Sequence, residues 1–291
     1  MKKFMVALLS LALIFNFAFL APSFGASDCA ETEDTVTIVY NEYVELEKLK
    51  EKSDKELSFM NYDAIEINKI RMIDYKKELE DRASLSVEQL ANMGYTDQQI
   101  GVLKSYSGSE METVTLAATL TLSITKGTIA NGNYTYNAST DRCYWKNTYT
   151  WKWDVGPLFM GNDTVAAGWA PTMSLSAGTN KTYYKNNYTG ASAGSTSQSF
   201  SLKGTNTIQC KNFTMAKNLD TSFRPAKYDW AYKGSGYVTA TGATQIRDLQ
   251  MEIAYGHATI SLSPSVSAPW GIGFSFNANV DKIGKTVQYY F

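Results

Sequence analysis

Alternation of apolar and polar residues dominates the sequence after Gly108 and restricts that part of the chain to β-structure. In the stretch CYWKNTYTWKW, residues 143–153, one face of an extended chain carries Cys143, Trp145, Tyr149, Trp151 and Trp153. Tyrosine, lysine and threonine fill the opposite face. The segment TVTLAATLTLSIT, residues 113–125, alternates in the same way. Because successive side chains of a strand point to opposite sides, both segments predict half-buried strands.

Short strand-like segments recur to the end of the chain. Gly, Asn and Ser separate them, and the Asn131-Gly132 pair is a hairpin signal. Further strands are expected near residues 165–169, 182–188, 196–202, 206–215, 228–232, 236–240, 246–262, 272–280 and 285–291. The sequence therefore predicts an all-β antiparallel sandwich over residues 112–291.

Residues 41–108 have helical periodicity and contain an internal repeat. Six residues recur 33 positions later: Ser53, Leu57, Met60, Tyr62, Ile67 and Ile70 map onto Ser86, Leu90, Met93, Tyr95, Ile100 and Leu103. A period of this length is typical of duplicated supersecondary units. We predict two 33-residue helix-turn-helix repeats, so that a short N-terminal helical repeat pair precedes the sandwich and the fold is α+β in separate sequence segments.

Polar residues mark where the helices of each unit begin and end. Four pairs have the spacing of a capping box: Ser53 with Glu56, Asp63 with Glu66, Ser86 with Gln89, and Thr96 with Gln99. Gly94 and its counterpart Asn61 suit the left-handed conformation that terminates a helix. Two such units bury little apolar surface alone, so we expect them to pack on each other or on the β domain as a stalk or docking element.

The N-terminus has the pattern of an export signal. Lys2 and Lys3 precede an apolar run from Phe4 to Leu20, and small residues follow at a fitting cleavage site. We predict that residues 1–26 are a signal peptide and that residues 27–40 form an acidic lead-in. The mature bacterial protein is then secreted or retained in the cell envelope.

The chain contains three cysteines. Disulfides can persist in an exported protein. Cys143 and Cys210 both lie in strand-like sequence, and we predict a disulfide between them. Cys29 is then left free, intermolecular or otherwise paired. With no CxxC pair and a single histidine, a Cys/His zinc site is not expected.

Charge is divided unevenly along the chain, although its net value is −1. Residues 27–112 hold 20 acidic and 10 basic residues, whereas residues 113–291 hold 8 and 15. Charge of this kind governs partners more than fold. A basic β domain favours anionic glycopolymers or lipid headgroups, and an acidic helical segment is able to mask it.

Catalytic chemistry has little support in the sequence. Most serine, cysteine and metal hydrolases use histidine, and only His257 is available, in the stretch AYGHAT beside a glycine typical of a bulge. No phosphate-binding glycine loop is present. We predict a non-enzymatic protein with no catalytic residue, no metal, no cofactor, and no nucleotide or nucleic-acid partner.

Aromatic residues near turn signals are the candidate ligand contacts. Flat apolar rings stack on sugars while short polar groups bond hydroxyls, and the stretches YDWAYKGSGY and WKWDVGPLFMGNDTVAAGWAP combine both kinds. Trp151 and Trp153 are expected in the core beside Cys143. The candidates for exposure are Trp169, Tyr228, Asp229, Trp230, Tyr232 and Trp270.

Two further functions remain open beside binding of an anionic glycopolymer at the cell wall. Residues 113–125 resemble the amphipathic hairpin strands of β-pore-forming toxins, which implies a membrane-active protein masked by its acidic helices. A purely structural surface protein is the third alternative.

Overall fold

The computed structural model describes residues 35–125, 132–223, 226–259, 264–267, 271–277 and 280–290, which belong to one compact unit. The predicted signal peptide, residues 27–34 of the predicted lead-in, Cys29, Asn131 and the candidate Trp270 lie outside the described residues.

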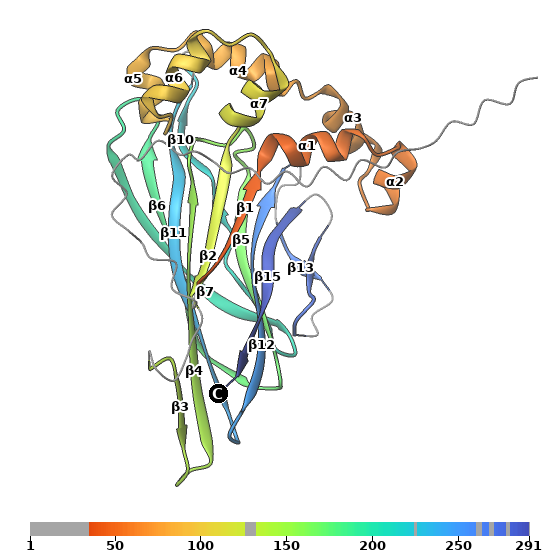
Figure 1. Cartoon of the computed structure of the whole chain (residues 1–291), viewed down its shortest axis with the longest axis vertical. Helices are drawn as coiled ribbons and strands as arrows, with labels where there is room; N and C mark the ends of the chain where they lie inside the picture. Colours follow the sequence, from red (N-terminus) through yellow and green to blue (C-terminus); the bar gives the residue numbers. More distant parts are fainter. Residues whose placement is uncertain are drawn as a thin grey trace, which may run out of the picture. The chain divides into compact units, whose positions relative to one another are not determined.

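Antiparallel β-sheet makes up most of this unit (Figure 1). Hydrogen bonds connect its main strands in the order β1-β2-β4-β11-β6-β7-β8-β5-β12-β15. Their bounds are β1 Thr35–Asn41, β2 Thr119–Thr125, β4 Arg142–Trp153, β5 Asn162–Ala170, β6 Ser174–Asn186, β7 Ser192–Gly204, β8 Thr207–Cys210, β11 Lys227–Gly242, β12 Asp248–Ala258 and β15 Val280–Tyr290. The shorter strands are β3 Tyr134–Asn137, β9 Phe213–Thr214, β10 Ala216–Asp220, β13 Val266–Ser267 and β14 Ser275–Phe276. The prediction of an antiparallel β fold is confirmed.

Strand β7 joins two facing layers. Its residues 192–199 pair with β6, and its residues 200–204 pair with β8 after a bend. We call β1, β2, β4, β11 and β6 the first layer, and β8, β5, β12 and β15 the second layer. Because one strand belongs to both, the hydrogen-bonded sheet continues from one layer into the other.

The core between the layers is aromatic. Trp151 of β4 lies 5.1 Å from Tyr255 of β12 between ring centroids and stacks on Phe213 at 5.3 Å. Trp145 contacts Tyr289 of β15 edge to face at 5.6 Å. All five rings are buried, and edge-to-face and offset contacts add to the free energy of burying their apolar area. The expected core position of Trp151 is confirmed.

Residues 113–125 are not one strand, in contrast to the prediction. Helix α7, Glu110–Leu116, occupies the first part, and β2 begins at Thr119. The Ser109 side chain caps α7 by accepting a hydrogen bond from the Glu112 amide. The Thr113 and Thr115 hydroxyls each donate to the backbone carbonyl four residues earlier. Alternation of Thr with Val or Leu fits one exposed helical turn as well as a strand. The apolar residues of β2 face the core, so they are not available to lipid: Leu120, Leu122 and Ile124.

The end of the predicted acidic lead-in is also part of the sheet. Strand β1 pairs with β2 over its whole length, from Thr35 opposite Thr125 to Asn41 opposite Thr119. Its residues TVTIVYN alternate like those of β2, and Val36 and Ile38 pack on the core. Because the next residue begins α1, this strand connects the helices directly to the first layer.

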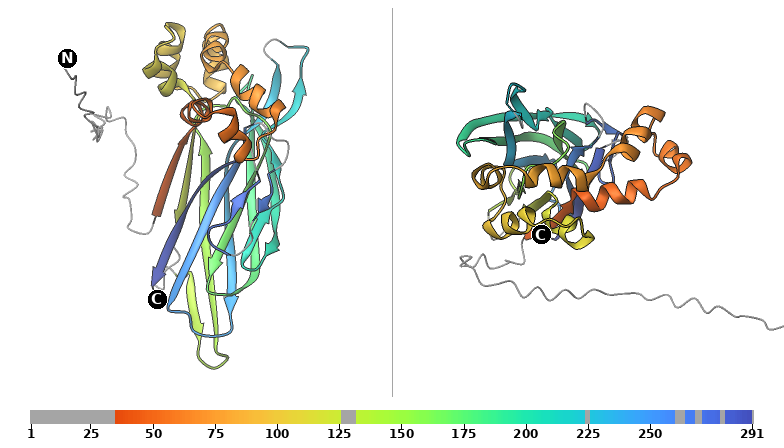
Figure 2. Two further views of the ribbon diagram at one scale, coloured as in Figure 1. Left: turned by 90° about the vertical axis from the view of Figure 1, so that its right-hand side faces the viewer. Right: turned by 90° about the horizontal axis from the view of Figure 1, so that it is seen from above.

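The helices gather at one end of the two layers (Figures 1 and 2). Their bounds are α1 Glu42–Lys50, α2 Asp54–Phe59, α3 Ala64–Met72, α4 Tyr75–Ala83, α5 Val87–Asn92, α6 Asp97–Lys104 and α7 Glu110–Leu116. All four predicted capping boxes are present, at the starts of α2, α3, α5 and α6. Gly94 and Asn61 have positive φ angles of 109° and 66°, which confirms the predicted helix ends. Duplication of the two hairpins stays a prediction.

Cys143 and Cys210 are both free and buried, so the predicted disulfide is wrong. Cys210 lies at the end of β8, where its Sγ is 3.2 Å from the Val165 amide nitrogen of β5. Cys143 lies near the start of β4 in the first layer, where its Sγ faces Gly242 of β11.

Glu42, the first residue of α1, connects the helices to the β layers. Its fully buried carboxylate accepts hydrogen bonds from the Leu158 and Phe159 amides at 2.7 and 2.9 Å and from the Tyr75 hydroxyl of α4 at 2.9 Å. His257 Nε2 of β12 lies 3.4 Å from the same carboxylate. One side chain thus satisfies polar groups from a helix, a loop and a strand.

His257 lies between two buried carboxylates. Its Nδ1 is 3.0 Å from Asp163 Oδ2 of β5, and Asp163 also accepts from the Tyr255 hydroxyl at 2.5 Å. Burial alone lowers the pKa of the imidazole, but the charges and hydrogen bonds of Asp163 and Glu42 outweigh it and raise that pKa to about 10. The histidine is therefore an imidazolium at neutral pH and makes two ion pairs.

Protonation of His257 should make the stability fall with alkaline pH. The pairing contributes in full below pH 6.5 and is lost as the pH rises through about 10, since the folded pKa is the higher one. Urea denaturation should show the free energy of unfolding falling by roughly 1.4 kcal/mol per pH unit over about pH 7–9. In His257→Gln this part of the slope should disappear, and equal slopes in the two proteins would contradict the assignment.

The corner between α5 and α6 docks on the loop that follows β4. The Gly156 amide donates to the Met93 carbonyl at 2.9 Å. A Cβ placed on Gly94 would lie 2.2 Å from the Asp154 carbonyl oxygen. Glycine is thus required here both by its positive φ and by the close backbone contact.

Gly94→Ala should destabilise the protein by about 2 kcal/mol or more, because it combines a left-handed alanine with a backbone clash. Gly101→Ala is the matched control, since Gly101 lies inside α6 with no atom near its Cβ position. That substitution should stabilise by roughly 0.5–1 kcal/mol. Thermal or chemical denaturation measures both, and a Gly94→Ala protein as stable as the parent would exclude the contact.

Candidate functional site

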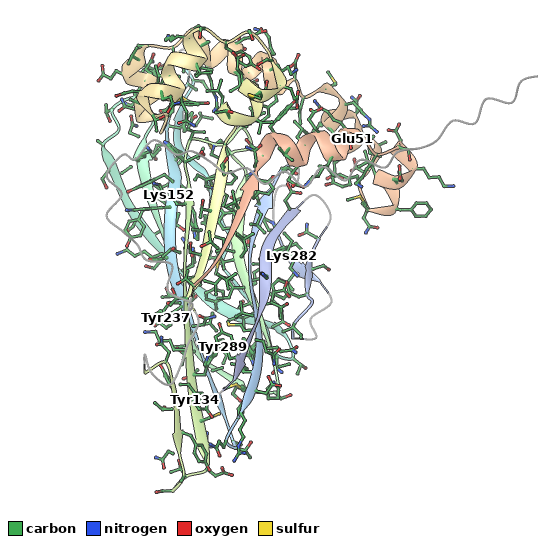
Figure 3. The ribbon with its side chains drawn as sticks, viewed as in Figure 1. Glu51, Tyr134, Lys152, Tyr237, Lys282 and Tyr289 are labelled. Carbon is green, nitrogen blue, oxygen red and sulfur yellow. The ribbon has the colours of Figure 1, made fainter. Side chains whose placement is uncertain are left out.

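The outward side of the first layer carries a group of lysines, which we call the lysine face. It consists of Lys146 and Lys152 on β4, Lys181 and Lys185 on β6, and Lys233 on β11. On β4 these lysines alternate with the buried tryptophans, so the pleat that fills the core with rings also directs the lysines to solvent. Figure 3 marks Lys152 on this layer.

Strand register brings these residues together. Lys233 is directly opposite Lys152 on one side and Tyr183 on the other. Two residues further along β11, Ser235 is opposite Thr150 and Lys181. Neighbouring strands lie about 4.8 Å apart, so ammonium and hydroxyl groups alternate across a continuous flat surface.

Tyrosine rings hold the lysine side chains. The Lys233 ammonium lies 5.4 Å from the Tyr183 ring centroid and 5.3 Å from that of Tyr232. Lys146 lies 4.9 Å from the ring of Tyr237, which Figure 3 labels on the same layer. Cation–π contacts of this kind contribute roughly 0.5–1 kcal/mol at exposed sites and orient the ammonium groups. The surface therefore presents aromatic rings and positive charges side by side.

Carboxylates are almost absent from these strands. Among β1, β2, β4, β6, β7 and β11, only Asp229 is acidic. Its two oxygens accept from the Asn186 and Asn218 side-chain amides, each at 2.7 Å. Within the described residues, none of the five lysines forms an ion pair. No described carboxylate thus neutralises the lysine face through an ion pair.

Crowding of like charge has a cost for the fold. Lys152 and Lys233 are a direct cross-strand pair, and like charges in that position are destabilising. Burial, followed by the charge of Lys152, lowers the pKa of Lys185. An anion on this surface would relieve the repulsion.

The helical acids do not pair with the lysine face in the described part of the chain. Apart from Glu42, which faces His257 of β12, their ion pairs are formed with lysines and an arginine of the helical segment itself, such as Lys48 with Glu45 and Lys77 with Asp81. The helices cover one end of the layers (Figure 1). The acidic residues of the helical segment therefore do not neutralise the lysine face through ion pairs in the described part of the chain.

The residues predicted as ligand contacts are only partly accessible. Trp169 and Trp230 are buried, at 0% and 1% exposure, so they are not the exposed aromatics that turn signals indicated. The Trp169 indole donates to the Met173 carbonyl, and the Lys185 ammonium lies over the Trp230 ring at 4.7 Å. Trp169 is covered by the 271–274 segment, where the Gly271 backbone approaches its strand, and Trp230 lies beside Gly156 of the loop after β4.

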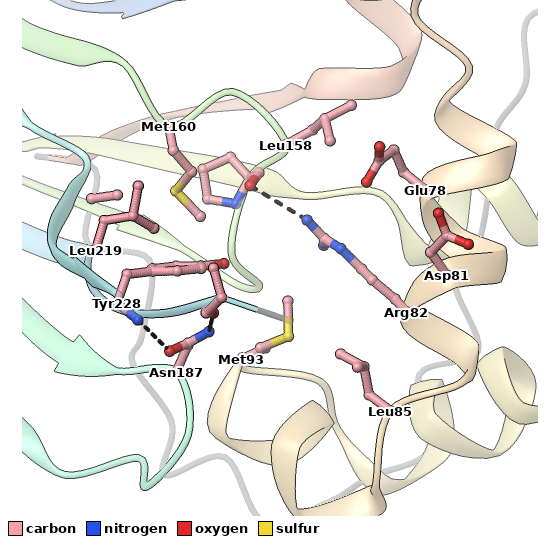
Figure 4. Close-up of a pocket in the computed structure, with 13 residues that line it drawn as sticks. Glu78, Asp81, Arg82, Leu85, Met93, Leu158, Met160, Asn187, Leu219 and Tyr228 are labelled. Carbon is pink, nitrogen blue, oxygen red and sulfur yellow. Dashed lines mark hydrogen bonds between the residues drawn. The ribbon is translucent and has the colours of Figure 1, made fainter. Parts of the chain in front are cut away.

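Three other predicted residues are half-buried on β11. Tyr232 belongs to the lysine face, as described above, and Asp229 is held by two asparagines. Tyr228 lines a pocket beneath α4 (Figure 4). Trp270 is outside the described residues. The structure thus brings Tyr232 into the candidate site and separates it from Trp169.

The lysines themselves were missed as site residues. Their signal was present in CYWKNTYTWKW, where Lys146 and Lys152 occupy the face opposite the tryptophans. A single strand shows two charges, but the neighbouring β6 and β11 supply the others through register.

No protein-family model matches the chain, and no curated protein matches its sequence. Among solved structures, the collagen binding subdomain of the Enterococcus faecalis surface protein ACE has 9% identity over 54% of this chain and 93% of its own, with a TM-score of 0.23. The C-terminal domain of the Streptococcus agalactiae AgI/II polypeptide BspA has 7% identity over 60% and 58%, with a TM-score of 0.29. Clostridium perfringens delta-toxin has 10% identity over 59% and 84%, with a TM-score of 0.23. Similarity at this level assigns neither family nor ligand.

None of the helices in the described ranges is long and apolar enough to cross a membrane.

Proposed function

We propose that this protein is an exported bacterial binding protein of the cell envelope or extracellular space. Its lysine face holds an anionic glycopolymer of the cell wall. The observation that carries the proposal is the set of five unpaired lysines on three adjacent strands that contain a single, already satisfied carboxylate.

Two kinds of contact support a polymer rather than a small anion. Two lysines lie six residues apart on β4, two lie four residues apart on β6 and one lies on β11 between them, so successive phosphates or carboxylates of one chain reach different ammonium groups. Between them, serine and threonine hydroxyls and the Tyr183 and Tyr237 rings suit sugar hydroxyls and apolar sugar faces. Long-range attraction then increases the association rate, and this contribution falls with ionic strength.

A non-catalytic role agrees with the environment of the histidine. His257 has 0% exposure and donates to carboxylates on both sides. A substrate cannot reach either ring nitrogen without displacing Glu42 or Asp163. We therefore propose binding, not hydrolysis, as the activity.

Exchange of three lysines should weaken binding strongly. Lys152→Gln, Lys181→Gln and Lys233→Gln together should reduce the affinity for purified teichoic acid at low salt by about tenfold or more, because each ion pair lost weakens the attraction. The slope of log affinity against log salt should also become shallower. Isothermal titration calorimetry at several ionic strengths measures both.

The matched control removes the same charge elsewhere. Lys203, Lys211 and Lys285 are exposed, lie outside the lysine face and are each changed to Gln. This variant should bind like the parent, and an equal loss in both variants would show that only net charge matters. Vesicles with anionic headgroups and loaded with calcein form a second arm. Dye release without binding to the polymer would overturn the proposal in favour of the membrane-active alternative, and no binding in either arm would favour a structural role.

A further inference from the structure

A pocket of about 470 Å³ lies where the helices meet the β layers (Figure 4). Its lining differs chemically from the lysine face. Small-molecule sites occupy roughly 300–1,000 Å³. Its walls are mainly apolar and come from α5, the loop after β4, β10 and β11: Met93, Leu158, Met160, Leu219 and Tyr228. Helix α4 closes the remaining side with Glu78, Asp81 and Arg82.

Opposite charges on α4 are kept apart in this pocket. Glu78 and Arg82 are four residues apart, the spacing at which a Glu–Arg pair usually forms on a helix. No ion pair joins them in the described structure. The Arg82 guanidinium instead donates to the Tyr95 hydroxyl and the Gly156 carbonyl, both at 2.9 Å, and to the Pro157 carbonyl at 3.4 Å.

The two charged groups therefore remain available to a ligand. Arg82 donates only to neutral oxygens, and among the described residues no carboxylate forms an ion pair with its guanidinium, so its Nε–H and one Nη2–H are free to donate to a ligand. The Glu78 carboxylate is exposed and forms no ion pair among the described residues, whereas Asp81 is paired with Lys77 at 2.6 Å. A cation and an anion one helical turn apart thus border an apolar cavity.

From this arrangement we propose that the pocket binds a zwitterion with an apolar side chain, an amino acid or the free ends of a dipeptide. The ligand carboxylate bonds to Arg82, and its ammonium group lies against Glu78. The apolar side chain packs between Met93 and Met160 on the ring of Tyr228. Charge complementarity to both ligand ends distinguishes this site from a merely apolar cleft.

The test compares ligands that differ only in their charged ends. Leucyl-leucine carries both charges, its N-acetyl derivative lacks the ammonium, and its amide lacks the carboxylate. Titration calorimetry with the full mature chain should show binding of the zwitterion and a loss of about tenfold or more for each capped form, since each removes a charged hydrogen-bonded contact. Equal affinity for all three would overturn the proposal, and so would the absence of binding at millimolar concentration.

Substitutions then locate the site. Glu78→Gln should weaken the zwitterion about tenfold without changing the affinity for the N-acetyl form. Glu80→Gln is the matched control, because Glu80 is exposed on the same helix and does not line the pocket. Met160→Trp should fill the cavity and abolish binding, and unchanged binding in that variant would place the ligand elsewhere. Arg82 is left intact, because its guanidinium also connects α4 to the loop.

Discussion

The buried carboxylate of Glu42 fixes the position of the helices on the β layers. It accepts from two loop amides and a tyrosine of α4, and it faces the imidazolium of β12. A buried charge that loses one partner is strongly destabilising. The helices, the loop after β4 and the second layer must therefore all be in place together. Leu158, whose amide binds Glu42, also forms a wall of the pocket beneath α4, so the same interaction determines the shape of the proposed zwitterion site.

Positive and negative side chains are separated more clearly on the folded surface than between the two segments of the sequence. The basic character of residues 113–291 is concentrated on the outward side of the first layer, whereas the acids of the β strands in the second layer are engaged: Asp163 with His257, Glu252 with Lys282, and Asp281 with the Tyr40 hydroxyl. Folding thus converts a modest excess of lysine into one strongly positive face. Strand β4 exposes lysines on one side and fills the core with aromatic rings on the other.

Local sequence signals predicted local structure well. Alternation predicted β4 and the antiparallel fold, and capping spacing predicted the starts of four helices. The failures concern features that local patterns do not determine. Residues 113–116 alternate like a strand but form helix α7, for which the Ser109 cap was an overlooked signal. The predicted pairing of Cys143 with Cys210 rested on strand-like sequence around each cysteine, which does not determine how close β4 and β8 bring the two thiols. The candidate site was only partly predictable, because exposure of Trp230 depends on the covering loop and the lysine face depends on register between strands distant in sequence.

Both ends of the described chain lie away from the helices. Strand β1 begins at Thr35, partway along the layers, and leads into α1, whereas β15 runs away from the helical end to Tyr290 (Figures 1 and 2).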